Sequence, residues 1–205
     1  MAARAACGGY GRRYVDSRNI WDMWALSTLS SGSYHHGDLR RSLIAAAREL
    51  LRASGVEAVT SREAARLAGV SHNAPYRHFA SREALLAAVA VEGFRELRRA
   101  LDAAREQAAP AERLTALGRA YLRFAEKDRA TFRLMFGGML ESAAHPDLAE
   151  AATAAFDALR AVVAEREPAA TTEREALRAW ALVHGLAHFV ADRQIDAARA
   201  EACLH

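Results

Sequence analysis

The chain has 205 residues, of which 52% are apolar and 26% charged, so it is long enough for one globular domain or two small ones that share a core. This composition excludes mucin-like, collagen-like and fully disordered proteins, and the apolar runs are too short and too often interrupted by charge to cross a bilayer. Two cysteines, Cys7 and Cys203, are too few for a disulfide framework or a zinc cluster and indicate a reducing, cytoplasmic compartment.

The formal net charge of +3 is distributed unevenly along the chain. Basic residues outnumber acidic ones in residues 1–33 and 34–106, whereas acidic residues prevail in residues 107–205. A basic front half joined to an acidic remainder suits a protein that binds a polyanion through its N-terminal part.

Residues 1–33 differ in composition from the rest of the chain. They contain a Gly-Gly-Tyr-Gly-Arg-Arg string and a serine-rich stretch, with neither a helical period nor a helix cap. They also lack the apolar core and the cleavage site of a signal peptide. We interpret them as a disordered leader or as upstream sequence included by a mis-called start, and a basic arm that touches DNA is the alternative.

Helical patterns begin near residue 38. An apolar stripe predicts an amphipathic helix over residues 38–53, which Gly55 ends. Thr60 and Glu63 then form a capping box, in which each side chain accepts from the backbone N–H of the other residue. The short helix that they open ends at Gly69.

Two further helices follow this glycine. Ser71 is expected to cap a third helix that runs through His78, with Pro75 in the first turn, where its missing N–H costs least. A fourth, longer helix begins at Ser81 and continues until Pro110.

The remainder of the chain also carries apolar residues at helical spacing, and its sequence shows no strand pattern. The predicted helices cover residues 111–127, 128–140, 147–166, 172–192 and 196–203, with Gly137-Gly138 as a break in the second of them. Because strong helix formers dominate throughout, the sequence predicts an all-α fold.

The segment of residues 60–79 has the pattern of a helix-turn-helix motif. Two short helices flank a turn at Gly69, where glycine can adopt the left-handed backbone that other residues resist. No acidic residue occurs in the sequence of residues 71–79, as required of a helix that enters a DNA groove. Asn73 can pair with adenine, while tyrosine, histidine and arginine side chains suit phosphate oxygens or guanine.

At these residues the chain resembles the TetR family of bacterial transcriptional regulators. The matching strings are Ala-Gly-Val-Ser-x-x-Ala-Pro-Tyr-x-His-Phe at residues 68–79 and Ser-Arg-Glu-Ala-Leu-Leu at residues 81–86. One branch of the family carries a Trp-x-x-x-His-Gly element in its C-terminal domain, and Trp180, His184 and Gly185 stand at that spacing.

The resemblance covers residues 34–192 and implies two domains. The head, residues 34–97, is a three-helix DNA-binding domain that contains the helix-turn-helix motif of residues 60–79. The body, residues 98–205, is a helical bundle that binds a small-molecule effector and forms the homodimer.

The resemblance also assigns residues to the DNA interface. His72 and Asn73 would face base edges, while Tyr76, His78 and Arg82 would hold phosphates. Packing of Tyr76 and His78 against the fourth helix is the alternative role. The full set of candidate DNA-binding residues is Thr60, Ser61, Arg62, Ser71, His72, Asn73, Ala74, Tyr76, Arg77, His78 and Arg82.

Aromatic residues and histidines of the body are the candidate effector-binding groups, and a packed core is their alternative role. This candidate set is Tyr121, Phe124, Phe132, Phe136, Trp180, His184 and His188. His184 and His188 lie one helical turn apart, but no nearby cysteine or Glu-x-x-His pattern in the sequence supports a metal site. We therefore expect neither a metal nor a cofactor.

The function implied is that of a homodimeric, cytoplasmic repressor that leaves a pseudo-palindromic DNA operator when a small, largely apolar effector binds. The dimer would form a four-helix bundle from residues 147–166 and 172–192 of both copies. A DNA-bound scaffold that recruits a protein and answers to no small molecule is the alternative. An enzyme has little support, because the sequence shows no nucleophile elbow, phosphate loop or carboxylate pair near a histidine.

Overall fold

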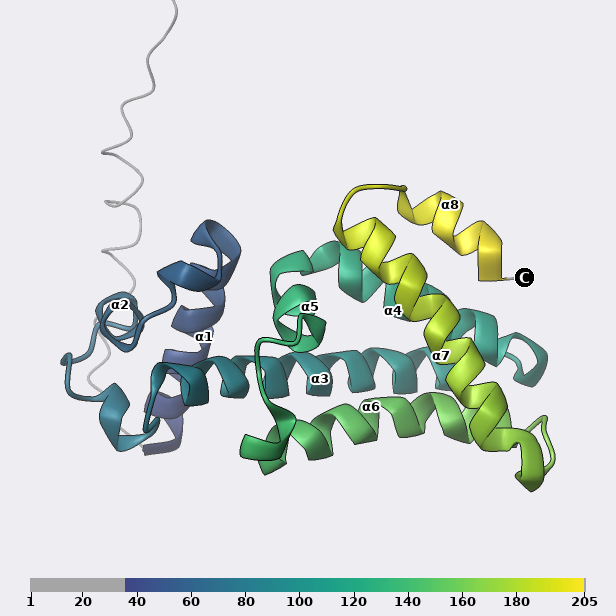
Figure 1. The fold of residues 1–205 in the computed structure, drawn as a ribbon, viewed down its shortest axis with the longest axis horizontal. Coiled ribbons are helices and arrows are strands. Elements are labelled where there is room, and N and C mark those ends of the chain that lie inside the picture. Colours follow the sequence, from purple (N-terminus) through teal and green to yellow (C-terminus); the bar gives the residue numbers. More distant parts are fainter. Residues whose placement is uncertain (1–35, 205) are drawn as a thin grey trace, which may run out of the picture. The chain divides into compact units, whose positions relative to one another are not determined.

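The computed structural model describes residues 36–204, and within this range the chain is built of helices joined by short turns (Figure 1). The predicted all-α fold is confirmed, since no strand occurs between residues 36 and 204. The interpretation of residues 1–33 as a leader concerns residues outside the described range. No helix in the described part of the chain is long and apolar enough to cross a membrane.

The helices of the head follow the predicted pattern up to Gly69. Helix α1 buries Leu43 and Ala47, and it ends before Gly55, whose φ of +80° is the left-handed conformation that glycine favours. The elements of this part are α1 (His36–Ser54), the 3-10 turn η1 (Val56–Ala58), α2 (Ser61–Leu67), the 3-10 turn η2 (Pro75–Arg77) and the beginning of α3 (Arg82–Gln107).

The predicted third helix is wrong in type and length. Residues 71–78 form a turn followed by the 3-10 helix η2, and no α-helix occurs among them. Pro75 has no N–H to donate to the carbonyl of Ser71, and that carbonyl instead accepts from the N–H of Ala74 at 2.9 Å, which closes a tighter turn. The predicted cap by the Ser71 hydroxyl is also wrong, because no side chain caps η2.

The helices predicted for the body are confirmed with small shifts at their ends. The predicted break at Gly137-Gly138 is confirmed, because the helix that begins at Arg129 ends at Phe136 and Gly138 is left-handed, with a φ of +70°. The elements after α3 are η3 (Pro110–Glu112), α4 (Arg113–Lys127), α5 (Arg129–Phe136), η4 (Ser142–Ala144), α6 (Pro146–Ala164), α7 (Ala169–Ala191), α8 (Ala197–Glu201) and η5 (Ala202–Leu204).

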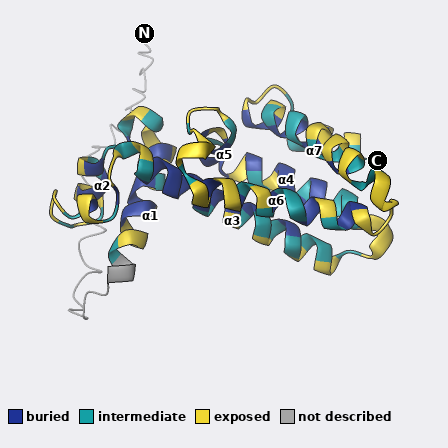
Figure 2. Cartoon of the chain, turned by 60° about the horizontal axis from the view of Figure 1, so that its bottom comes forward, coloured by how far each residue is buried: buried dark blue, intermediate teal, exposed yellow. Residues whose placement is uncertain are grey.

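Helix α3 is shared by the head and the body. Its beginning packs against α1, and it packs further along against α4, α5 and α6, the last of which runs beside it (Figure 1). One buried core runs from Leu43 of α1 through Leu85 and Leu97 of α3 to Val190 of α7, and buried positions follow the inner faces of these helices (Figure 2). The predicted boundary after residue 97 falls inside α3, and the division into head and body stays a prediction.

Candidate functional site

Gly69 shapes the turn of the helix-turn-helix motif, as predicted. Its φ is +68°, its N–H donates to the carbonyl of Arg66 at 3.2 Å, and the N–H of Val70 donates to the carbonyl of Ala65 at 3.0 Å. These two bonds form a Schellman motif, which ends α2 and directs the chain toward η2.

The N-terminus of α2 carries half of the predicted capping box. Thr60 Oγ1 accepts a hydrogen bond from the N–H of Glu63 at 3.1 Å. The Glu63 carboxylate accepts from Arg66 Nε at 2.8 Å, so the prediction that it reaches back to the N–H of Thr60 is wrong. The long arginine side chain competes successfully for the carboxylate because it adds charge to the hydrogen bond.

The turn and η2 present exposed polar and aromatic side chains. Tyr76 is 62% exposed, which is a large fraction for an aromatic residue and does not fit packing against α3. His72, Asn73 and Arg77 are exposed as well. Of the other candidates, Arg62 and Ser71 are exposed, Thr60, Ala74 and His78 are half-buried, and Ser61 is buried.

Arg82, which is predicted to hold a phosphate, is tied to the loop before α2. Its Nε donates to the carbonyl of Val59 at 2.7 Å, and its Nη2 donates to the carbonyl of Val56 at 2.6 Å. The same Nη2 lies 3.5 Å from a carboxylate oxygen of Glu57. These contacts fasten η1 to the beginning of α3, so Arg82 has a structural role, and its contact with DNA stays a prediction.

A buried polar network joins α1 to the body. Asp128 is 4% exposed and caps α5 by accepting from the N–H of Thr131 at 3.2 Å. It also accepts from Arg48 Nε at 2.9 Å and from Arg52 Nη2 at 2.5 Å, both on α1. Arg48 forms a two-bond ion pair with Glu96 of α3. One carboxylate thus connects two arginines of α1 with the first turn of α5.

The arginines keep the carboxylates of this network ionised. Burial alone would raise the pKa of Asp128, but hydrogen bonds from Arg52, Thr131 and Arg48 outweigh burial and lower that pKa from 3.8 to about 2. The pKa of Glu96 is lowered too, chiefly by its hydrogen bonds from Arg48. Each buried charge therefore has a partner, the condition under which such charges persist inside a protein.

Six of the seven candidate effector-binding residues form one aromatic cluster. Their ring centroids lie 4.6–6.4 Å apart, mostly in edge-on or tilted arrangements. The members are Tyr121 from α4, Phe132 and Phe136 from α5, and Trp180, His184 and His188 from α7. Phe124, the seventh candidate, is half-buried at the edge of the core, outside this cluster.

A chain of hydrogen-bonding atoms runs through the aromatic cluster. Tyr121 Oη lies 2.9 Å from His184 Nδ1, and His184 Nε2 lies 3.2 Å from His188 Nε2. Burial raises the pKa of Tyr121 well above 10 and lowers the pKa of His184, to which the nearby His188 contributes. Tyr121 and His184 are therefore uncharged at neutral pH. Within residues 36–204, no third His, Cys, Asp or Glu side chain joins the two histidines to make a metal site.

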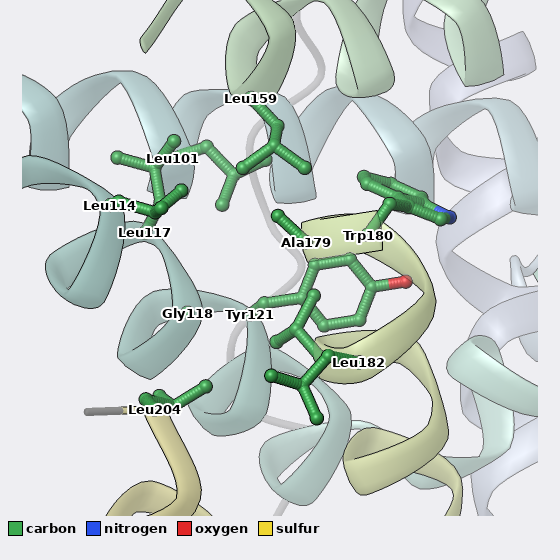
Figure 3. Close-up of a pocket in the computed structure, with 11 residues that line it drawn as sticks. Leu101, Leu114, Leu117, Gly118, Tyr121, Leu159, Ala179, Trp180, Leu182 and Leu204 are labelled. Carbon is green, nitrogen blue, oxygen red and sulfur yellow. The ribbon is translucent and has the colours of Figure 1, made fainter. Parts of the chain in front are cut away.

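A cavity of about 90 Å³ lies beside this cluster (Figure 3). Among the candidate residues only Tyr121 and Trp180 line it, and no charged side chain does so. Its other large lining residues are mainly leucines, namely Leu101, Leu114, Leu117, Leu159, Leu182 and Leu204. Sequence reasoning missed these leucines, because their spacing is that of ordinary core positions.

Two family models match the chain. Residues 43–89 match the model of bacterial regulatory proteins of the tetR family, and residues 114–204 match the model of the tetracyclin repressor-like, C-terminal domain. The chain belongs to the TetR family of bacterial transcriptional regulators.

Solved structures similar to this TetR family chain agree with the fold. A protein with unknown function from Rhodococcus sp. RHA1 is 38% identical, has a TM-score of 0.73, and the match covers 83% of this chain and 92% of that chain. The TetR family regulator PfmR from Thermus thermophilus is 24% identical, with a TM-score of 0.59 and coverage of 79% and 94%. FadR from Bacillus subtilis, in complex with stearoyl-CoA, is 15% identical, with a TM-score of 0.66 and coverage of 80% and 94%. No curated protein matches the chain.

Membership of the TetR family makes the chain a DNA-binding transcriptional regulator. The resemblance that residues 68–79 carry is thereby confirmed, while the roles of individual side chains toward DNA and effector stay predictions. The network of Asp128 is a part of the molecule that sequence reasoning missed. The spacing of Asp128 and Thr131 is a readable helix cap, but its arginine partners lie 76 and 80 residues earlier in the chain.

Proposed function

We propose that this TetR family regulator is a homodimeric repressor that leaves its operator when a small, largely apolar molecule binds in the body. The proposal rests on the exposed side chains at the Gly69 turn and on the buried ion network of α1. This helix packs against α2, and the network joins it to α5, which carries Phe132 and Phe136 of the aromatic cluster. The exposed side chains supply a surface for DNA. The ion network supplies a route by which a ligand bound in the body can act on that surface.

The exposed side chains at the turn have the chemistry that DNA requires. His72 and Asn73 can donate to and accept from base edges, and Tyr76 and Arg77 can donate to phosphate oxygens. The sequence of residues 71–79 has no acidic residue that would repel the phosphates. In a dimer, two such surfaces must stand about 34 Å apart to enter successive major grooves.

Fluorescence anisotropy tests the DNA-binding part of the proposal. The full chain would be titrated against labelled DNA that flanks its own gene and against random DNA, across a salt series. We expect tight, sequence-selective binding whose affinity falls steeply with salt, because phosphate contacts release counterions. Equal and weak binding to both DNAs would argue against an operator in this region.

Helix α7 offers a surface for a second copy of the chain. Leu177 and Phe189 are 59% and 48% exposed, and a Cβ atom at Gly185 between them would meet nothing within 4 Å. The exposed residues of α6 include the polar Thr153 and Arg160. We therefore infer that α7 supplies the apolar part of the dimer interface, with α6 beside it, as in the predicted four-helix bundle.

Replacing Leu177 with arginine is expected to shift the chain from dimer to monomer, because a charge at the interface would be buried without a partner. Light scattering after gel filtration would measure the mass at several protein concentrations. Met139→Arg is the matched control, since Met139 is 50% exposed and lies on the segment between α5 and α6. Equal masses for both variants would contradict an interface on α7.

The body favours an apolar effector of modest size. FadR from Bacillus subtilis was solved with stearoyl-CoA, a large and charged molecule. The cavity in this chain measures about 90 Å³, and no charged side chain lines it. A charged head group would lose its water there without gaining a partner, so we propose an uncharged ligand.

The buried network gives the effector a mechanical connection to the head. Phe132 and Phe136 belong to the aromatic cluster and lie on α5, whose first turn is bound through Asp128 to Arg48 and Arg52 of α1. A ligand that prefers a shifted α5 would also favour a shifted α1, in proportion to that preference. Operator affinity that stays constant across a screen of apolar ligands would instead favour the scaffold alternative.

A further inference from the structure

One side chain of the last described segment lines one end of the leucine-lined cavity. This C-terminal segment, residues 197–204, comprises α8 and η5 and packs against α4 and α7. Leu204 reaches from it into the cavity lining beside Gly118 (Figure 3). A Cβ atom on residue 118 would lie only 2.8 Å from Leu204 Cδ1, so it is the absence of a side chain on α4 that allows the leucine this position.

Two of the polar contacts between the C-terminal segment and α4 are long. Thr115 Oγ1 donates to the carbonyl of Leu204 at 3.4 Å, and Arg119 Nε lies 3.8 Å from Glu201 Oε2. Hydrogen bonds and exposed ion pairs at these distances contribute little. Apolar contacts also hold the segment, those of the fully buried Ala200 and those of Leu204 in the cavity.

The cavity is too small for most organic ligands while Leu204 is in place. Its volume is about 90 Å³, whereas a dry apolar cavity that binds benzene has measured about 150 Å³. Of the lining leucines, Leu182 is 51% exposed, and Leu114 and Leu204 are half-buried. Leu204 is the one that belongs to the short C-terminal segment, whereas the others lie on the longer helices α3, α4, α6 and α7. A larger molecule would gain space most directly by displacing the Leu204 side chain.

We propose that Leu204 is the gate of this cavity and that Leu204 and Gly118 together set the size of the uncharged apolar molecules it admits. This inference rests on the effector cavity of the proposed function. In the closed state the Leu204 side chain fills one end of the cavity against Gly118. In the open state the segment of residues 197–204 moves away from α4, and ligand atoms replace the leucine. Large ligands bind only to the open fraction of molecules, which reduces their apparent affinity.

The gate is tested by replacing Leu204 with alanine and measuring the binding of two uncharged probes. N-phenyl-1-naphthylamine, a fluorescent probe much larger than the cavity, is expected to bind the variant about tenfold more tightly than the wild type, because the open fraction no longer limits it. Xenon is a single atom that the closed cavity can hold. Its affinities for the variant and the wild type, measured by ¹²⁹Xe NMR, are expected to differ by less than about twofold. Leu204→Met, which conserves volume, and Met139→Ala, outside the lining, should both behave as the wild type.

The outcomes separate the gate from the proposed function. If the wild type binds the naphthylamine probe and releases operator DNA, while Leu204→Ala binds it no better, the gate is overturned and the effector function stands. An equal gain for both probes would overturn size selection by Leu204. If neither the wild type nor Leu204→Ala binds the probe, and operator affinity does not respond to it, both the gate and the effector function are overturned. Thermal melting checks the fold, and Leu204→Val replaces the alanine variant if that variant melts early.

Discussion

Replacing Asp128 with alanine is expected to lower the free energy of unfolding by about 3–5 kcal/mol, because it removes one partner from a buried ion network. Arg48 would keep its ion pair with Glu96 but lose its Nε bond to Asp128 Oδ2, Arg52 would lose its bond to the same oxygen, and α5 would lose its N-terminal cap. Urea unfolding followed by circular dichroism would measure the loss. The change also removes the carboxylate that links α1 to α5 and leaves the longer bond from Arg48 Nε to Thr131 Oγ1, at 3.3 Å, so any variant that still folds should respond more weakly to an effector.

The matched control for this change is Asp157→Ala. Asp157 is paired with Arg160 one turn away on the surface of α6, so its loss is expected to cost less than about 1 kcal/mol. If both variants lost the same small amount of stability, the network at Asp128 would behave as an ordinary surface ion pair, and its proposed role would be wrong.

The free energy of unfolding should also fall in acid, as Asp128 becomes protonated. The pKa of Asp128 falls from 3.8 in the unfolded chain to about 2 in the folded chain, because its hydrogen bonds from Arg52, Thr131 and Arg48 outweigh the effect of burial. A carboxyl whose pKa is lowered by folding stabilises the folded chain when the pH is above its pKa in the unfolded chain. This contribution, about 2.5 kcal/mol, is lost as the pH falls from about 5 through 2. Unfolding measured at successive pH values should show this loss in the wild type, and Asp128→Asn should remove that part of it.

The long helices could be predicted from the sequence because each buries one apolar face. The predictions over residues 147–166 and 172–192 agree with α6 (Pro146–Ala164) and α7 (Ala169–Ala191) to within a few residues at each end. The third helix could not be predicted in this way. Residues 71–78 have almost no apolar period, and the backbone bonds around Pro75 decide whether an α-helix or a 3-10 turn forms.

The candidate site of the body could be predicted only in part. Aromatic residues such as Phe132 and Trp180 stand out in a sequence with few rings, and they do gather in one cluster. The cavity does not stand out, because Leu101 and Leu159 have the spacing of packed core residues. A cavity depends on how side chains from several helices fill the space between them, and no single segment of the sequence shows this.

Replacing Tyr76 with alanine is expected to weaken binding to operator and random DNA alike, by about 1.5–3 kcal/mol for each head if the hydroxyl donates to a charged phosphate. Both heads of a dimer would lose the contact, so the total loss of affinity could reach twice that figure. Anisotropy titrations on both DNAs would measure it. Because Tyr76 is 62% exposed, its removal should leave the melting temperature nearly unchanged. Tyr76→Phe separates the hydroxyl from the ring and should reproduce most of the loss.

Asn73 provides the contrast that distinguishes reading a base from holding the backbone. Its amide can pair with adenine through two hydrogen bonds, so Asn73→Ala is expected to remove about 1–3 kcal/mol of discrimination at one base position of each half-site. Binding to random DNA should change little, because no specific pair is lost there. Titrations against operators altered at single positions would locate the relaxed base. If Asn73→Ala and Tyr76→Ala weakened binding to every DNA equally, the two residues would share a backbone role, and the base contact would have to be sought at His72.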